Sequence, residues 1–306
     1  MKIIITILLM GLMFSTSCNK DILDKVPLDI ISDATVWNDE SLIDAYLTQT
    51  YYQTYVFVLE CTKADMWGVP IDGLIGAFGI SQISDEAMYG WWITTLRGYI
   101  YKFGNLKNDG GVLEWWEDSY KVIRALNVFL QKIPLAPVDK DFVKQRVAEA
   151  RFLRAYNYFA MVKRYGGVPL ITEPQDINDP VDKLYPKRAT EQVVYDFILS
   201  EIDKIYNDLP SVNSTNDYGR PTKYAALALQ CRAALYAGSI AKFGTVQLDG
   251  VVGINSAQAN SYYQKAYDAA NLIIGSGLYK LYNQDADKTK NFKNIFLVKN
   301  NSEAIF

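Results

Sequence analysis

Apolar residues recur at spacings of three and four along most of the chain after residue 112, and this period predicts amphipathic helices. The clearest stripe steps by four, three, four and three, and it consists of Ala148, Phe152, Ala155, Phe159 and Val162. Arg151 and Arg154 lie off this stripe. Gly166 and Gly167 predict the end of the helix, because glycine readily adopts the conformation that closes helices. Val168 then begins a stretch that we expect to be extended.

Two more helices are predicted before this one. The first begins near Asp39 and continues past Tyr52, with Ser41 or Asn38 as its N-cap. The second ends at Pro134, because proline cannot continue a helix. Its expected buried face consists of Leu113, Trp116, Tyr120, Ile123, Asn127 and Leu130.

Three helices are predicted in the last third of the chain. One runs from about Glu191 to Asp208, with Thr190 as its N-cap, and its stripe consists of Val194, Ile198, Ile202, Ile205 and Leu209. The next opens at Pro221 and is rich in alanine, which allows a neighbouring helix to approach closely. Its expected apolar face consists of Tyr224, Ala228, Cys231 and Leu235. The last ends near Gly275, and its stripe consists of Tyr263, Ala266, Ala270 and Ile273.

Two regions depart from helical periodicity. From Thr62 to Asn108 the pattern breaks up and glycines are frequent, which predicts a long loop region rich in Trp and Tyr. From Asn291 to Phe306 the alternation of apolar and polar positions predicts a strand. The predicted fold is therefore mainly α, a tetratricopeptide-like scaffold of helical pairs with long irregular loops and little strand. A strict repeat period is not visible.

The N-terminus has the features of an export signal. Lys2 precedes an apolar run from Ile3 to Phe14, and small residues lead to Cys18. This run of about 12 residues is shorter than the roughly 20 that span a bilayer. We therefore predict that residues 1–17 are a lipoprotein signal peptide and that Cys18 carries the lipid. The alternative is a plain cleavable signal with an incidental cysteine.

The amino-acid composition argues against several classes of function. The 306 residues are half hydrophobic and carry a net charge of −3, so we expect no nucleic-acid partner, which would require a basic face. The chain has no histidine, which excludes Ser-His-Asp and Cys-His catalysis and histidine-ligated metals. Paired carboxylates remain possible, but no pair stands out. We expect no enzymatic activity, cofactor or metal site.

For Cys61 and Cys231, buried thiols are favoured over a disulfide.

Several short motifs occur in an order and spacing that resemble the SusD/RagB family of outer-membrane glycan-binding lipoproteins. The most specific are Ala150–Tyr156 and Tyr165–Leu170. The others are Cys18 with Leu23–Pro27 and Trp37, Ser84–Glu86 ahead of Trp116, Tyr120, Ile123, Arg124 and Asn127, Gly219–Thr222 with Ala225 and Ala226, Leu235–Ala237, and Ser302–Phe306. The resemblance extends over nearly all of residues 18–306.

This resemblance implies a protein anchored to the outer membrane through its lipid and exposed on the cell surface. It implies a helical scaffold with a loop-rich face that binds glycan, and a SusC-like TonB-dependent barrel as partner. Family members usually run well beyond 306 residues. We therefore expect an N-terminal helical region at 18–240, then a last helix pair and the start of a truncated C-terminal region at 241–306.

Glycan binding needs aromatic platforms beside hydrogen-bonding side chains, and the loop from Asp65 to Tyr101 contains both. The candidate platforms are Trp67, Tyr89, Trp91 and Trp92, and the candidate polar partners are Asp65, Asp72 and Arg97. No family motif fixes these residues. Arg151 and Arg154 lie in the strongest motif, yet we interpret them as structural, since charges on a packed helix usually pair with acidic neighbours.

Two alternative functions stay open at this point. Tetratricopeptide-like grooves often take peptides, so the chain could be a peptide- or protein-binding member of the same scaffold. A surface glycoside hydrolase that uses two carboxylates is less favoured. Retention of oligopeptide instead of polysaccharide would indicate the first, and release of reducing sugar would indicate the second.

Overall fold

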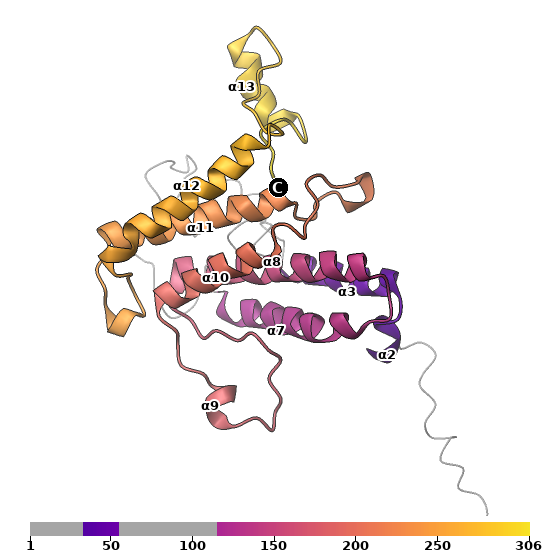
Figure 1. The fold of residues 1–306 in the computed structure, drawn as a ribbon, viewed down its shortest axis with the longest axis vertical. Helices are drawn as coiled ribbons and strands as arrows, with labels where there is room; N and C mark the ends of the chain where they lie inside the picture. Colours follow the sequence, from indigo (N-terminus) through magenta and orange to yellow (C-terminus); the bar gives the residue numbers. More distant parts are fainter. Residues whose placement is uncertain (1–32, 55–114) are drawn as a thin grey trace, which may run out of the picture.

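The computed structural model describes residues 33–54 and 115–306, and these form a stack of helices without any strand (Figure 1). The helices are α2 (Asp33–Val36), α3 (Glu40–Gln53), α7 (Trp116–Lys132), α8 (Lys140–Tyr165), α9 (Val181–Leu184), α10 (Glu191–Ile205), α11 (Lys223–Phe243), α12 (Ala259–Gly275) and α13 (Lys288–Leu297). Short 3₁₀ turns lie at Ile133–Leu135, Thr215–Asp217, Leu248–Gly250 and Ser256–Gln258. The mainly helical fold class is thereby confirmed.

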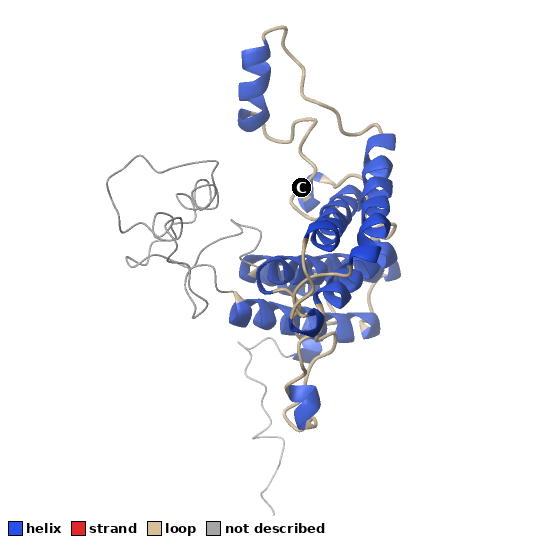
Figure 2. Cartoon of the chain, turned by 90° about the vertical axis from the view of Figure 1, so that its left-hand side faces the viewer, coloured by secondary structure: helices blue, strands red, loops and turns tan. Residues whose placement is uncertain are grey.

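Successive long helices pack on one another, as expected for stacked helical pairs. α7 packs on α8, α8 on α10, α10 on α11 and α11 on α12. Figure 2 shows these helices in stacked layers, with α13 set apart from them by loops. Within the described ranges, no helix combines the length and apolar character needed to cross a bilayer.

The core follows the predicted stripe of α8. Ala148, Phe152, Ala155, Phe159 and Val162 are all buried. The helix contacts α3, α7, α10 and α11, so apolar side chains on several of its faces are covered. It ends at Gly166, whose φ of 67° is strained for other residues, and this confirms the predicted stop.

Two N-caps test the predicted helix starts. The cap of α3 is Asp39, whose carboxylate accepts hydrogen bonds from the backbone N–H groups of Ser41 and Leu42, so the prediction of Ser41 or Asn38 is wrong. Thr190 caps α10 as predicted, by accepting from the N–H of Val193. The whole predicted stripe of α10 is buried.

The buried face of α11 differs from the prediction. Leu235 is 48% exposed, and Tyr224, Ala228 and Cys231 are only half-buried. The alanine face packs instead, and its fully buried members are Ala226, Ala233, Ala234 and Ala237. Small residues occupy these positions because α12 approaches α11 closely. A Cβ atom added at Gly238 would lie 2.8 Å from the Tyr263 ring.

The Cys231 thiol is free and half-buried, and Cys61 lies outside the described residues.

The predicted strand at the end of the chain is wrong, because residues 288–297 form helix α13. Asp287 caps it by accepting from the N–H groups of Thr289 and Lys290. Phe292 and Phe296 stack edge to face at 5.5 Å, a contact that an i,i+4 spacing permits only in a helix. A strand also needs a partner edge, and residues 33–54 and 115–306 contain no strand to supply one.

Candidate functional site

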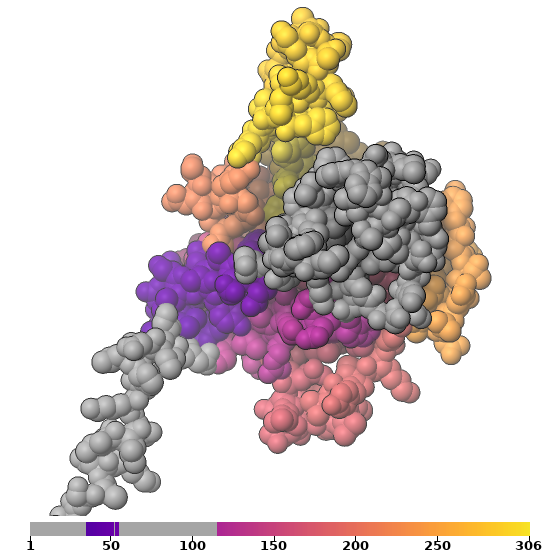
Figure 3. Space-filling model, turned by 180° about the vertical axis from the view of Figure 1, so that it is seen from behind, coloured from indigo at the N-terminus to yellow at the C-terminus, as the bar shows by residue number. Residues whose placement is uncertain are grey.

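A groove of about 590 Å³ runs between α7 and the segment that joins α8 to α10. We call it the α7 groove. Its described lining residues are Trp116, Glu117, Tyr120, Lys121, Ile123, Arg124, Pro169, Ile171, Glu173, Gln175, Leu184, Tyr185 and Pro186. The segment that carries α9 projects from the helical body beside it (Figures 1 and 3).

The floor of the α7 groove carries aromatic side chains that helical spacing places on the same face of α7. Trp116, Tyr120 and Ile123 are separated by four and three positions, which places them on one face of α7. The Trp116 ring lies 5.4 Å from the Tyr120 ring and 5.3 Å from the Tyr165 ring, in tilted and edge-on arrangements. Such pairs hold the rings in one orientation.

One wall of the groove is the irregular segment after Gly167, and side chains of α7 fix it in place. The Tyr120 hydroxyl donates to the carbonyl of Pro169 at 2.8 Å. Asn127 Nδ2 donates to the Ile171 carbonyl at 2.9 Å, and Arg124 Nη1 donates to the Gln175 carbonyl at 2.8 Å. Burial is the main reason that the pKa of Tyr120 is raised well above its ordinary value, so its hydroxyl remains a donor. The wall is therefore preformed.

The outer rim is closed by a local bridge. The Gln175 side-chain amide donates to the carbonyls of Lys183 at 2.5 Å and Leu184 at 3.1 Å. This bridge brings Tyr185 to the rim, where its side chain is 79% exposed. A large aromatic ring is thus presented to solvent at the edge of a concave, mostly apolar surface.

Charges around the groove are balanced. The described lining residues include two cations, Lys121 and Arg124, and two anions, Glu117 and Glu173. Lys121 also forms an ion pair with Glu117 at 2.6 Å. No group of histidine, cysteine, aspartate and glutamate that could hold a metal ion occurs in the described part of the chain. The arrangement offers donors, acceptors and apolar rings, which is the chemistry of ligand binding.

The residues predicted from the sequence as glycan contacts lie outside the described ranges. This holds for Asp65, Trp67, Asp72, Tyr89, Trp91, Trp92 and Arg97, and for Cys18. The helical spacing predicted Trp116 and Tyr120 on the buried face of α7, where both are only half-buried, and it gave no role to Tyr185. The one local signal for Tyr185 is its position before Pro186, since a residue before proline favours extended backbone.

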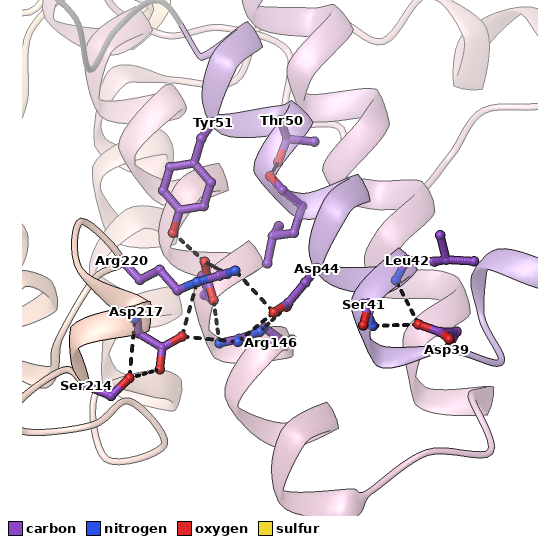
Figure 4. Close-up of polar contacts among 12 residues, drawn as sticks. Asp39, Ser41, Leu42, Asp44, Thr50, Tyr51, Arg146, Ser214, Asp217 and Arg220 are labelled. Atoms are coloured by element: carbon purple, nitrogen blue, oxygen red, sulfur yellow. Dashed lines mark hydrogen bonds and ion pairs between the residues drawn. The ribbon is translucent and has the colours of Figure 1, made fainter.

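A second polar cluster joins α3, α8 and the loop before α11 (Figure 4). Arg146 bonds Asp44 at 2.5 Å and Glu149 at 3.1 Å, and Arg220 bonds Glu149 at 2.7 Å. The Tyr51 hydroxyl donates to Glu149 at 2.5 Å. Burial raises the pKa of the Glu149 carboxyl, and Arg220 and Arg146 oppose that rise. Because each charge is matched by partners inside the cluster, we assign it to structure.

Arg154 confirms the structural interpretation of its motif. It donates to Glu201 at 2.6 Å, to Asn127 Oδ1 at 2.8 Å and to the carbonyl of Thr172 at 3.0 Å. Arg151 lies 3.9 Å from Glu201. The motif therefore connects α7, α8, α10 and the groove wall through the buried Arg154, while Arg151 is partly exposed beside Glu201.

Comparison with known proteins agrees with this architecture. Residues 84–235, about half of the chain, match the family model SusD-like_3, described as starch-binding and associating with the outer membrane. SusD-like protein P38 of Formosa agariphila is 31% identical over 121 residues, which are 40% of this chain and 22% of that protein. A SusD-like protein of Bacteroides ovatus is 24% identical over 223 residues, or 72% and 36% of the two chains. The matches thus cover well under half of these curated relatives.

Solved structures share the fold. A SusD-like protein from Bacteroides fragilis superposes with a TM-score of 0.59 at 24% identity, over 92% of this chain and 47% of that chain. A laminarin-binding SusD-like protein gives a TM-score of 0.58 at 22% identity, over 88% and 51%. With the family match, the shared motifs and the stacked helical pairs, the chain belongs to the SusD/RagB family of SusD-like proteins.

Proposed function

We propose that this protein is a surface lipoprotein of the outer membrane that captures glycan, without cleaving it, for a SusC-like TonB-dependent transporter. The observation that carries the proposal is the match of residues 84–235 to a family described as starch-binding and associating with the outer membrane. The solved relative described as laminarin-binding supports carbohydrate as the class of ligand.

The physical basis is stacking of sugar on aromatic rings. The apolar faces of a pyranose lie against Trp or Tyr, while its hydroxyls bond to acidic, amide or guanidinium groups. Such binding requires no proton transfer, which suits a chain that has no histidine. We propose the loop from Asp65 to Tyr101 as part of the glycan platform, with Trp67, Trp91 and Trp92 as its main rings.

Replacing Trp67, Trp91 or Trp92 with alanine should weaken glycan binding, because each change removes a stacking surface. The parent protein should bind with micromolar or weaker affinity, about −8 kcal/mol or less in magnitude, since a shallow platform desolvates little area. Calorimetry against a polysaccharide panel measures the affinity, and circular dichroism confirms that each variant is folded.

The same panel separates the alternatives. Recovery of the bound sugar unchanged is expected, and release of reducing ends would instead indicate a hydrolase. Binding of oligopeptides without binding of any polysaccharide would indicate a peptide-binding member of the fold. If all three tryptophan variants bind as the parent does, the proposed platform is wrong.

The substitution Cys18→Ala should release the protein from membranes. The expectation follows from the short apolar run that ends in small residues and Cys18, because each buried lipid methylene contributes about 0.8 kcal/mol to anchoring. The measurement is fractionation of cells that lack any barrel partner, with Cys231→Ala as the matched control. Recovery of the Cys18→Ala variant with the outer membrane of such cells would contradict lipid anchoring.

A further inference from the structure

The most exposed aromatic ring of the α7 groove, that of Tyr185, does not belong to the hydrophobic core. Tyr185 is 79% exposed, whereas Trp116 and Tyr120 at the floor are half-buried. The bridge from Gln175 to the carbonyls of residues 183 and 184 fixes the backbone next to Tyr185 at the rim. An exposed ring at the rim of a concave apolar floor suits a ligand with flat apolar faces.

The backbone of the groove wall is already engaged, which disfavours an extended peptide. Peptides that add to an extended segment do so by main-chain hydrogen bonds. Here the Pro169 carbonyl accepts from Tyr120, and the Thr172 carbonyl accepts from Arg154. The Ile171 carbonyl accepts from Asn127, and both its N–H and its carbonyl bond to the Tyr158 hydroxyl. A ligand must therefore be held mainly by side chains.

The side chains at the rim match a neutral polyhydroxylated ligand. Glu117 and Glu173 supply acceptors, while Lys121 and Arg124 supply donors, so hydroxyl groups that both donate and accept find partners. The described lining has equal numbers of cations and anions. A carboxylated or sulfated glycan would need an excess of cations in the groove, because proteins recognise carboxylate and similar anionic groups with clusters of arginine.

We infer that the α7 groove is a carbohydrate-binding site in its own right, made by residues other than those of the Asp65–Tyr101 platform, and that it takes a neutral stretch of glycan stacked on Tyr185. This inference rests on the proposed function, since it names the class of glycan and a second place where it binds. Trp116 and Tyr120 form the floor, and the charged rim orients the hydroxyls.

The test uses three variants of the full chain and a panel of neutral and anionic polysaccharides, including soluble starch, laminarin, polygalacturonate and carrageenan. Tyr185→Ala should weaken binding of the neutral glycan that the parent prefers by about tenfold, equivalent to about 1.4 kcal/mol. Tyr185→Phe should bind as the parent does, because the ring is retained. Tyr267→Ala is the matched control, since Tyr267 is 63% exposed on α12 and does not line the groove.

Salt dependence gives a second readout. Binding of a neutral chain should change by less than about twofold when the ionic strength rises from about 0.01 M to about 0.15 M, although screening shortens from about 30 Å to about 8 Å. A steep loss of affinity with salt, or a preference for the anionic polysaccharides, would overturn the neutral assignment.

The outcomes distinguish the two claims. If the parent binds no polysaccharide of the panel, the proposed function fails and the groove assignment fails with it. If the parent binds a neutral glycan and Tyr185→Ala binds equally well, the function stands and the groove assignment is wrong. A loss shared by Tyr267→Ala would also overturn the assignment, because the effect would not be local to the groove.

Discussion

Replacement of Arg154 by alanine should destabilise the protein by about 3–5 kcal/mol, as breaking a buried ion pair generally does. The Arg154 and Glu201 side chains are only 6% and 4% exposed, and they meet at 2.6 Å. The substitution leaves the Glu201 carboxylate buried without its closest cation, and it also removes the donors to Asn127 and Thr172. The free energy of unfolding from denaturant melts measures the loss.

Two controls show whether the loss comes from an uncompensated charge. The double variant Arg154→Met with Glu201→Leu should recover much of the stability, because neither charge then remains in the core. Arg151→Ala should cost less than about 1 kcal/mol, since its side chain is 34% exposed and lies 3.9 Å from Glu201. A loss below about 1 kcal/mol for Arg154→Ala would show that Glu201 is adequately compensated by its other neighbours.

Phe152→Ala should destabilise the protein by about 3–5 kcal/mol, the range found when a buried aromatic ring is deleted. Phe152 is 1% exposed at the centre of α8, and its ring contacts Phe306 edge to face at 5.4 Å. Removal of the ring leaves a cavity that the surrounding helices cannot fill without shifting. Denaturant melts followed by circular dichroism give the change in unfolding free energy.

The matched control for Phe152 is Phe243→Ala on α11. Phe243 is 76% exposed, so its loss should change stability by no more than about 0.5 kcal/mol. Similar effects of the two substitutions would mean that the stripe of α8 does not form the core. The comparison isolates burial, because both changes remove the same ring from a helix.

The α7 groove could not be predicted because its two sides are distant in the sequence. Tyr120 and Pro169 are 49 positions apart, and Arg124 and Gln175 are 51 apart, yet each pair shares a hydrogen bond. Helical periodicity reports which residues share a face, but not which segment covers that face. The platform on the Asp65–Tyr101 loop, in contrast, was inferred from local composition, and it stays a prediction.

Local patterns alone determined the long helices α3, α7, α8, α10, α11 and α12. The stripes of α8 and α10 follow from the spacing of apolar residues, and Thr190 and Gly166 mark helix ends because capping depends on near neighbours. The motifs that identified the family are likewise short and contiguous.

Only the tertiary structure decided which face of α11 is covered, the helical state of residues 288–297 and where distant polar groups meet. The face of α11 depends on how closely α12 approaches, so small alanines are buried and Leu235 is not. Residues 288–297 are helical since no strand among the described residues offers an edge to pair with. Arg146 and Asp44 are 102 positions apart, and their pairing requires α3 and α8 to be packed together. These features depend on contacts between distant segments, which no local period encodes.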